Sequence, residues 1–197
     1  MVDLQRDFLD DGAAPVEGTS AVVAPAVRLV QAFRAAGRPV VHVVRLYSSD
    51  GVDVDTVRRA AIESGVRIVA PGTDGAEPAV GLLPDGARLN AHLLLSGRLQ
   101  VVGEREAVVF KPRWSAFHRT ALDDWLVELG CDTVVVAGCN LPNCPRATLT
   151  DATERDLRAV LATDAVSRSS PERLGDLAAI GVVLMPTDEI VSHLARL

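Results

Sequence analysis

Three side chains of this sequence suggest nucleophilic chemistry: the carboxylate of Asp3, the ammonium group of Lys111 and the thiol of Cys144. Each follows residues typical of a buried strand, which are MV before Asp3, AVVF before Lys111 and TVVVAGCNLPN before Cys144. Ligands of open α/β sheets bind beyond the carboxyl ends of the strands, so we expect the three groups to share one edge of a sheet. The thiolate would attack an acyl carbon, the carboxylate would move the proton and the lysine would support the negative charge.

Lys111 is the only lysine of the chain, whose other basic residues are all arginine. An ammonium group is compact and its pKa shifts readily, whereas a guanidinium is broad and always charged. Chance is the alternative explanation. We interpret the lone lysine as a position at which arginine would spoil the chemistry.

Cys144 is followed by Pro145, and proline is favoured at the first position of a helix. We therefore expect Cys144 to be the N-cap, with its sulfur close to free N–H groups and to the positive end of the helix dipole. Such a site predicts a thiol pKa lowered from about 8.5 toward roughly 7. Cys131 and Cys139 are expected to be small buried apolar residues, and no CxxC pattern indicates a zinc site.

Short β-branched runs alternate with helical periodicity, which is typical of an α/β fold with a parallel sheet. Strands are predicted at 39–44, 107–111, 132–138, 158–164 and 181–186, and helices at 22–33, 52–65, 118–129, 145–156, 171–179 and 187–196. Residues 45–106 break the rhythm, and we expect long loops there that cover a site or meet a partner subunit. Only two residues precede Asp3, so the first strand is either a stub or, as we favour, truncated at Met1.

Composition excludes several classes of function. A chain of 197 residues that is 48% hydrophobic predicts one domain, 1–197. The net charge of −6 argues against a nucleic-acid partner, and the apolar runs are too short to span a membrane. No secretory signal opens the sequence, and three cysteines cannot all pair, so a cytoplasmic location is expected.

Three motifs resemble those of the isochorismatase-like cysteine hydrolases, a superfamily that includes nicotinamidases, N-carbamoylsarcosine amidases, ureidoacrylate amidohydrolases and isochorismatases. They are VDLQRDF (2–8), FKPRWSAF (110–117) and AGCNLPNCPRATLTDA (137–152). The resemblance places the catalytic aspartate at Asp3, the catalytic lysine at Lys111 and the nucleophile at Cys144. It implies a three-layer α/β/α fold with a six-stranded, mostly parallel, Rossmann-like sheet. It also implies a cis peptide at Cys139–Asn140 and an oxyanion hole formed by the backbone N–H groups of Asn140 and Cys144.

Departures from the family patterns narrow the expected reaction. Nicotinamidases carry an Asp-x-His and further histidines that bind a metal, whereas this chain reads RLYSSDGVDVD after the strand at 39–44. His42 lies inside that strand and is predicted to be a core residue, so we expect no metal and no cofactor, and nicotinamide is disfavoured. Isochorismatases that cleave a vinyl ether commonly lack the cysteine. Hydrolysis of a C–N bond in a small amide, ureido or carbamoyl substrate remains, and the loop GCNLPNC indicates a subgroup.

The predicted mechanism has Asp3 take the thiol proton, Cys144 form a thioester and water release the product. Six residues are candidates to contact substrate, with a core or solvent-facing role as the alternative for each: Phe8, Arg45, Tyr47, Arg113, Trp114 and Phe117. Two other functions stay open, a vinyl-ether hydrolase that does not need the thiol and a non-catalytic oligomerising member. Association into a homo-oligomer, a dimer or tetramer, is implied by the resemblance.

Overall fold

The computed structural model describes residues 1–196. Its helices and strands, in chain order, are η1 Arg6–Phe8, α1 Thr19–Ala35, β1 Val40–Val44, α2 Thr56–Glu63, η2 Asp74–Ala76, α3 Ala91–Leu95, β2 Gln100–Gly103, β3 Glu106–Phe110, α4 Leu122–Glu128, β4 Thr133–Gly138, α5 Cys144–Thr153, β5 Arg158–Val166, α6 Pro171–Ala179, β6 Val183–Met185 and α7 Thr187–Leu194. The predicted α/β class is confirmed.

The strands form two three-stranded sheets, in the orders β1-β3-β2 and β4-β5-β6. All neighbours are parallel except β2, which runs antiparallel to β3. Val2 connects the two sheets, because it forms parallel bridges with Val43 of β1 and with Gly138 of β4. The predicted first strand is therefore a single bridging position between β1 and β4.

Gly138 makes this connection possible. Its φ is 137°, and a Cβ at this position would overlap the carbonyl group of Val2. Hydrogen bonds fix this segment to both sheets. The N–H of Val2 donates to the carbonyl of Ala137 (2.8 Å), and the N–H of Asp3 donates to the carbonyl of Val43 (2.9 Å). The backbone of Asp3 is thus held between the two sheets.

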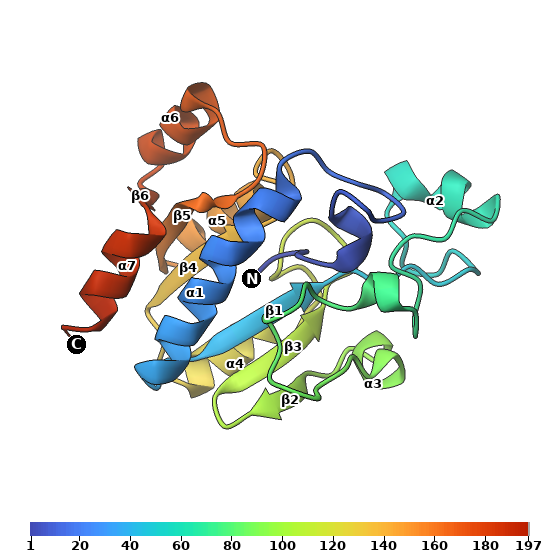
Figure 1. Ribbon diagram of the computed structural model, residues 1–197, viewed down its shortest axis with the longest axis horizontal. Coiled ribbons are helices and arrows are strands. Elements are labelled where there is room, and N and C mark those ends of the chain that lie inside the picture. The colour runs from blue at the N-terminus through green and yellow to red at the C-terminus, as the bar shows by residue number, and fades with distance from the viewer. Residues whose placement is uncertain (197) are drawn as a thin grey trace.

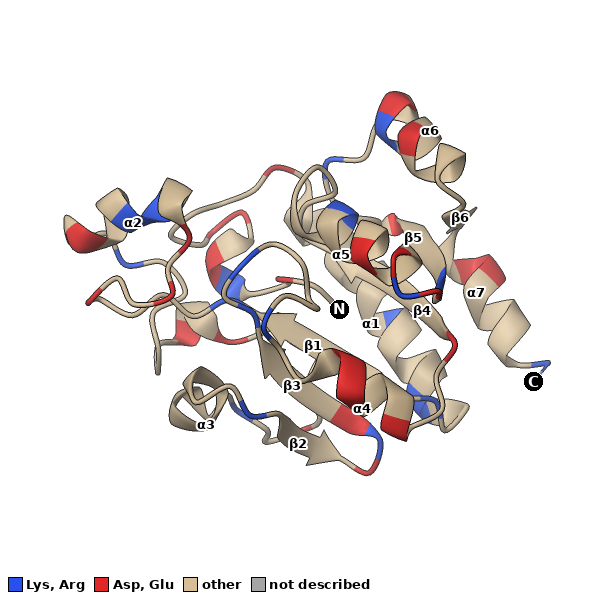
Figure 2. Cartoon of the chain, turned by 180° about the vertical axis from the view of Figure 1, so that it is seen from behind, with Lys and Arg blue, Asp and Glu red and all other residues tan. Residues whose placement is uncertain are grey.

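Helices cover both faces of the sheet. Helices α1 and α7 lie together on one face, and α4 and α5 cover the other (Figures 1 and 2). Helix α1 buries the stripe Val22, Ala26, Leu29 and Val30, whose spacing is that of one helix face. Two apolar clusters result, and Cys144 belongs to the one that contains residues of α4, α5 and α6.

The region 45–106 contains more regular structure than expected. Helix α2 lies beyond the carboxyl ends of β1 and β3, while β2 forms an edge of the sheet and the short helix α3 lies beside it (Figure 1). The expectation of no strand in this region is wrong, since β2 pairs with β3. Strand β2 has only four residues, none of them fully buried, so it lacks the apolar signal of the central strands.

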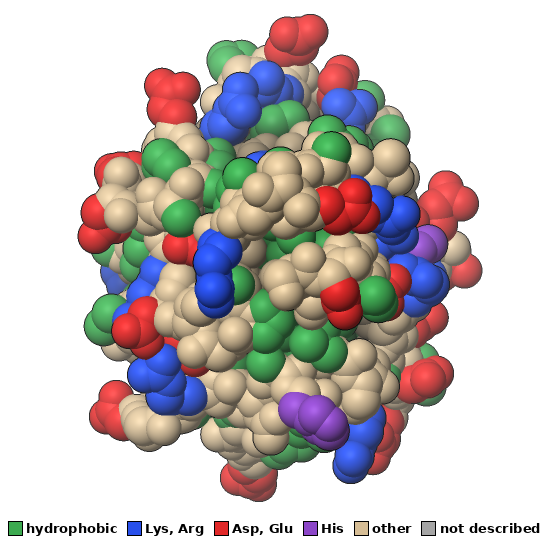
Figure 3. Space-filling view, turned by 90° about the vertical axis from the view of Figure 1, so that its right-hand side faces the viewer, with side chains coloured by type: hydrophobic (Ala, Val, Ile, Leu, Met, Phe, Trp, Pro, Cys, Tyr) green, Lys and Arg blue, Asp and Glu red, His purple; other side chains and the backbone are tan. Residues whose placement is uncertain are grey.

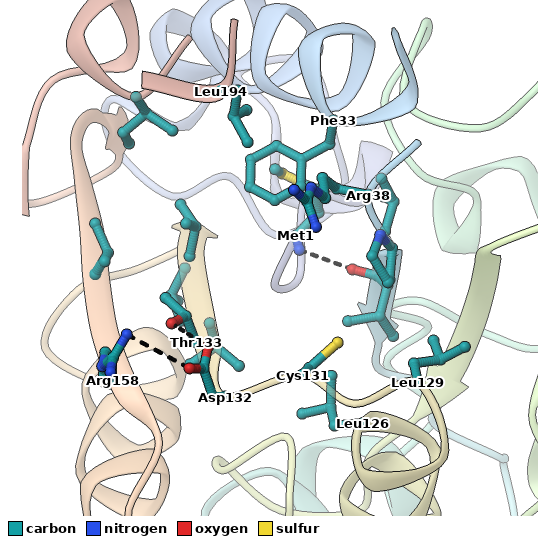
Figure 4. A pocket seen from close by; sticks show the side chains of 18 of the residues that line it. Met1, Phe33, Arg38, Leu126, Leu129, Cys131, Asp132, Thr133, Arg158 and Leu194 are labelled. Carbon is teal, nitrogen blue, oxygen red and sulfur yellow. Dashed lines mark hydrogen bonds and ion pairs between the residues drawn. The ribbon is translucent and has the colours of Figure 1, made fainter. Parts of the chain in front are cut away.

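A cavity of about 630 Å³ opens at the amino-terminal ends of β1 and β4 (Figure 4). Apolar side chains from several elements line it, among them Phe33 of α1, Trp125 and Leu126 of α4, and Cys131. Asp3, Lys111 and Cys144 are not part of this lining. Within residues 1–196 no helix is both long and apolar enough to cross a membrane.

Candidate active site

Asp3 and Lys111 form a buried ion pair at the carboxyl end of β1. Lys111 Nζ lies 2.8 Å from Asp3 Oδ2, and Lys111 is 0% exposed. Backbone hydrogen bonds tie both residues to β1, because the N–H of Asp3 donates to Val43 and that of Lys111 donates to Val44. Lys111 Nζ also donates to the carbonyl of Arg113 (3.3 Å). Removing either charge would leave the other buried and unpaired, which is costly.

The two oxygens of the Asp3 carboxylate have different surroundings. Lys111 holds Oδ2, whereas Oδ1 is buried and accepts no hydrogen bond from residues 1–196. Asp3 has a φ of 51°, in the left-handed region that non-glycine residues seldom adopt. A buried carboxylate with one anchored and one free oxygen is suited to accept a proton.

Cys144 is the first residue of α5, and Asn143 precedes it as the N-cap. The prediction of Cys144 as the N-cap is therefore off by one position, because Cys144 already has helical geometry and Pro145 is the second residue of the helix. Thr148 connects this first turn to the loop after Lys111. Its hydroxyl donates to the carbonyl of Cys144 (2.8 Å) and accepts from the N–H of Ala116 (3.0 Å).

The predicted lowering of the thiol pKa is wrong. Burial raises the pKa of Cys144, and the negative charge of Asp3 raises it further. The positive charges of Lys111 and Arg45 act in the opposite direction but do not outweigh these effects. The free thiol is thus protonated at neutral pH, so a reaction at Cys144 needs a base to remove its proton.

The loop before α5 presents two backbone N–H groups. The Cys139–Asn140 peptide bond is cis. The loop is fixed by hydrogen bonds from the N–H of Leu141 to Ser167 (2.9 Å) and from that of Asn143 to Asn140 (3.0 Å). In the described part of the chain, the N–H groups of Asn140 and Cys144 donate to no backbone acceptor. Both are therefore available to a ligand oxygen.

Arg45 brings a second buried ion pair to Cys144. Its Nη1 donates to Asp55 Oδ2 (2.9 Å), and its Nη2 lies 3.8 Å from Cys144 Sγ. The hydroxyl of Tyr47 donates to the same carboxylate oxygen of Asp55 (2.9 Å). Burial raises the pKa of Tyr47 well above its usual range. The positive charge of Arg45 acts in the opposite direction, while the charge of Asp55 and the hydrogen bond to it raise the pKa further, so this hydroxyl stays protonated.

Sequence reasoning missed Asp55 and Gln5. Asp55 immediately precedes α2 and looks like a helix cap, yet its side chain makes no capping hydrogen bond. The side-chain amide of Gln5 donates to the carbonyls of Arg45 (2.8 Å) and Ala76 (2.6 Å), and its oxygen accepts from the N–H of Arg45 (2.8 Å). The position of Gln5 within the motif VDLQRDF was the signal that could have identified it. Its role is to position Arg45.

The other predicted substrate contacts occupy different surroundings. Phe117 packs in the apolar cluster of Cys144, with the guanidinium of Arg155 4.7 Å from its ring centroid. Phe8 packs in the second cluster, and Trp114 is 47% exposed. Arg113 is half-buried and donates to the carbonyls of Asp53 and Pro112.

His42 is a core residue, as predicted. It is 2% exposed, and its Nε2 lies 2.7 Å from Glu106 Oε1. Burial lowers its pKa, so it is neutral. Across residues 1–196, no three His, Cys, Asp or Glu side chains are grouped so that they could hold a metal ion.

Comparison with known proteins places the chain in a family. The Isochorismatase domain model matches residues 1–183. A probable inactive nicotinamidase from Arabidopsis thaliana is 34% identical over 189 residues, covering 92% of this chain and 88% of the relative. The ureidoacrylate amidohydrolase RutB of Methylobacterium radiotolerans is 30% identical, covering 85% of this chain and 63% of the relative.

Two crystal structures support the same assignment. An isochorismatase family protein from Desulfovibrio vulgaris superposes with a TM-score of 0.83 at 34% identity, covering 100% of this chain and 96% of that one. N-carbamoylsarcosine amidase from Thermoplasma acidophilum superposes with a TM-score of 0.74 at 28% identity, covering 95% and 94%. The chain therefore belongs to the isochorismatase family, whose fold and hydrolase-type relatives agree with the strand-end site described above.

Proposed function

We propose that this protein is a cysteine-dependent amidohydrolase that cleaves a C–N bond of a small amide, ureido or carbamoyl compound. The observation that carries the proposal is the buried Asp3–Lys111 pair, whose charges act on the Cys144 thiol and whose free oxygen, Asp3 Oδ1, has no other partner. The amidohydrolases among the relatives support this reaction class.

The raised thiol pKa determines the first step. The thiol proton passes to Asp3 Oδ1 as the Cys144 sulfur forms a bond to the substrate carbonyl carbon. Lys111 keeps Asp3 oriented and balances its charge until the proton arrives. The N–H groups of Asn140 and Cys144 donate to the oxygen that becomes negative, and one such donor is typically worth about 3 kcal/mol.

The second half of the reaction uses the same groups. Asp3 gives its proton to the leaving nitrogen, the C–N bond breaks and a thioester remains on Cys144. A water molecule then loses a proton to Asp3 and attacks the thioester carbon. The Cys144 sulfur leaves and recovers the proton, which restores the starting state.

The substrate proposed here is not nicotinamide. Residues 45–55 place Arg45, Tyr47 and Asp55 at the site and contain no histidine, whereas metal-binding histidines are expected of a nicotinamidase. The Arabidopsis relative is itself named a probable inactive nicotinamidase. We further propose that the loop GCNLPNC marks a subgroup with its own substrate.

Ammonia release from a panel of small amides, ureides and carbamoyl compounds tests the proposal. Wild-type protein is expected to hydrolyse at least one of them, and Cys144→Ala to hydrolyse none. Cleavage of a vinyl ether that persists in Cys144→Ala would instead identify a thiol-independent hydrolase. No hydrolysis by correctly folded wild-type protein across the panel would contradict the proposal.

A further inference from the structure

We infer that Arg45 is the specificity-determining residue of this site and that it selects amides carrying a carboxylate close to the scissile carbonyl. This inference rests on the proposed function and adds the chemical class of the substrate. It is carried by the contacts of the guanidinium, by the charges around it and by its distance from the nucleophile.

The guanidinium of Arg45 is fixed at one end and free of oxygen partners at the other. Nη1 donates to Asp55 Oδ2 (2.9 Å) and to the carbonyl of Pro112 (3.1 Å). Nη2 contacts only Cys144 Sγ (3.8 Å) among residues 1–196, although it carries two N–H donors. Arg45 is 3% exposed, so these donors are shielded from water. Buried donors without an oxygen acceptor are costly, and their direction toward the nucleophile indicates a ligand group.

The charges at the site leave an excess of positive charge. The pairs Lys111–Asp3 and Arg45–Asp55 are each neutral. The guanidinium of Arg113 lies next to that of Arg45, because Nη1 of each donates to the carbonyl of Pro112 (2.7 and 3.1 Å). Arg113 makes no ion pair within the described residues, and the carboxylate of Asp53 pairs with Arg119. With the thiol protonated, these groups carry a net charge of +1, which favours an anionic substrate.

This positive charge is internal. The face of the molecule shown in Figure 3 carries acidic and basic side chains interspersed with hydrophobic ones, so it does not form a basic surface. This face therefore offers an anion no basic surface, and recognition of the anion depends on the side chains of the site.

The distance from Arg45 to the nucleophile limits where the carboxylate sits. A carbonyl carbon under attack lies about 3–3.5 Å from the sulfur. Since Nη2 is 3.8 Å from that sulfur, a carboxylate two or three bonds from the carbonyl carbon falls within hydrogen-bonding distance of Nη2. Short monoamides of dicarboxylic acids and N-carbamoyl amino acids have this arrangement. Cys144 is 8% exposed, which also favours a small substrate.

Two other roles for Arg45 make different predictions. A residue that only stabilised the thiolate would accelerate attack on charged and neutral reagents alike. A residue that only held Asp55 and Pro112 would affect stability without discriminating between reagents.

Alkylation of Cys144 by iodoacetate and by iodoacetamide distinguishes these roles without a known substrate. Both reagents attack the same thiolate, so the ratio of their rates is independent of the thiol pKa. We expect this ratio to exceed that of glutathione by at least about tenfold in the wild type, because the anion bonds to Arg45. Arg45→Gln should lower the ratio by about 10- to 100-fold. The iodoacetamide rate should fall by a smaller factor than the iodoacetate rate, because the charge of Arg45 also lowers the thiol pKa. Arg158→Gln, at the opposite end of the sheet, is the matched control and should leave the ratio unchanged.

A wild-type ratio equal to that of glutathione would overturn the inference, and so would an equal fall of both rates in Arg45→Gln. Because Arg45→Gln leaves Asp55 unpaired and can destabilise the protein, the double variant Arg45→Met, Asp55→Asn serves as a second test. It removes both charges together and should show the same loss of the ratio.

A pair of substrates then separates this inference from the proposed function. Succinamate and its methyl ester present the same amide with and without the negative charge. Preference for succinamate that disappears in Arg45→Gln supports both proposals. Equal hydrolysis of the two together with a flat alkylation ratio overturns the role of Arg45 alone. A high ratio with no amide hydrolysed supports anion recognition by Arg45 and counts against the amidase.

Discussion

The two ends of the space between β1 and β4 differ in size and chemistry. At the amino-terminal end lies a cavity of about 630 Å³ lined mainly by apolar side chains (Figure 4). At the carboxyl end, Asp3, Lys111 and Cys144 are almost covered, and their charged groups are paired. The largest apolar pocket is the usual first candidate for an active site. Here the convergence of buried polar groups at strand ends is the better guide.

A thiol is present at each end, Cys131 at the amino-terminal end and Cys144 at the carboxyl end. The pKa values of Cys131 and Cys144 are both raised, in each case chiefly by burial. Of these two thiols, Cys144 is the one on which the charge of Asp3 acts, and Asp3 Oδ1 has no hydrogen-bond partner among residues 1–196. In the same described part of the chain, the N–H groups of Asn140 and of Cys144 itself donate to no backbone acceptor. The neighbours that can move a proton therefore distinguish Cys144 from Cys131.

Removing each thiol by substitution of the cysteine with alanine gives the largest expected contrast. Cys144→Ala should lower kcat for amide hydrolysis by at least about 10⁴-fold, because the covalent route is lost. Cys131→Ala, which enlarges the cavity at the other end, should stay within about twofold of the wild type. Ammonia release measures both. Comparable losses in the two variants would mean that the cavity takes part in the reaction.

Lys111→Arg tests the buried cation and is expected to have a smaller effect. The guanidinium is too large for a site with 0% exposure, so we expect overpacking to cost about 1–3 kcal/mol of unfolding free energy. Displacement of Asp3 should lower kcat by about 10²-fold. Urea denaturation and ammonia release provide the two readouts.

The control for Lys111→Arg is Arg158→Lys at the amino-terminal end. Arg158 forms an exposed ion pair with Asp132 (3.4 Å), and such pairs contribute little to stability. The control should match the wild type in both measurements. Full activity of Lys111→Arg would remove the explanation for the single lysine.

The smallest expected effect on activity is that of replacing Glu106, which lies near the amino-terminal end of the sheet. Burial alone would raise its pKa, but hydrogen bonds from Arg34 and His42 outweigh burial and lower it to about 2. Its charged form therefore stabilises the fold above about pH 4.5, and this contribution is lost as the pH falls toward 2.

Glu106→Gln should reduce the unfolding free energy by about 2 kcal/mol at pH 7. The difference from the wild type should disappear near pH 2, and kcat should stay nearly unchanged at pH 7. Denaturant titrations at several pH values measure the difference in unfolding free energy, with Glu104→Gln, at an exposed position, as the control. A difference that is the same at pH 7 and pH 2 would show that the charge of Glu106 does not stabilise the fold.

Much of the fold could be predicted because the central strands and the helices carry strong local patterns. The helix expected at 171–179 is observed as Pro171–Ala179, since Ser170 and Pro171 mark its start and the N–H of Arg173 bonds to the Ser170 hydroxyl. Asp3 and Lys111 could be brought together because parallel strands end at the same edge of the sheet. Strand β2 could not be predicted, because an edge strand of four partly exposed residues has little apolar signal.

The electrostatics of the site depend on burial, which local patterns do not contain. The position of Cys144 at the start of α5 suggested a lowered pKa, but its depth and the charge of Asp3 reverse the direction. Asp55 was missed because its partner, Arg45, is ten residues away and meets it only through the fold of the intervening loop. In both cases the deciding contact joins segments that no periodicity connects.

Whether Asp3 takes the proton of Cys144 is best tested by the rate at which iodoacetamide alkylates Cys144, followed from pH 6 to 10 in the wild type and in Asp3→Asn. The charge of Asp3 raises the thiol pKa, so Asp3→Asn should lower the midpoint of the pH–rate curve and be alkylated faster at pH 8. Its amide hydrolysis should fall by about 10²- to 10⁴-fold, because the base is lost. Faster alkylation with slower hydrolysis would identify Asp3 as the base for a neutral thiol. A midpoint of the pH–rate curve that stays the same or rises in Asp3→Asn would contradict the proposed role of Asp3.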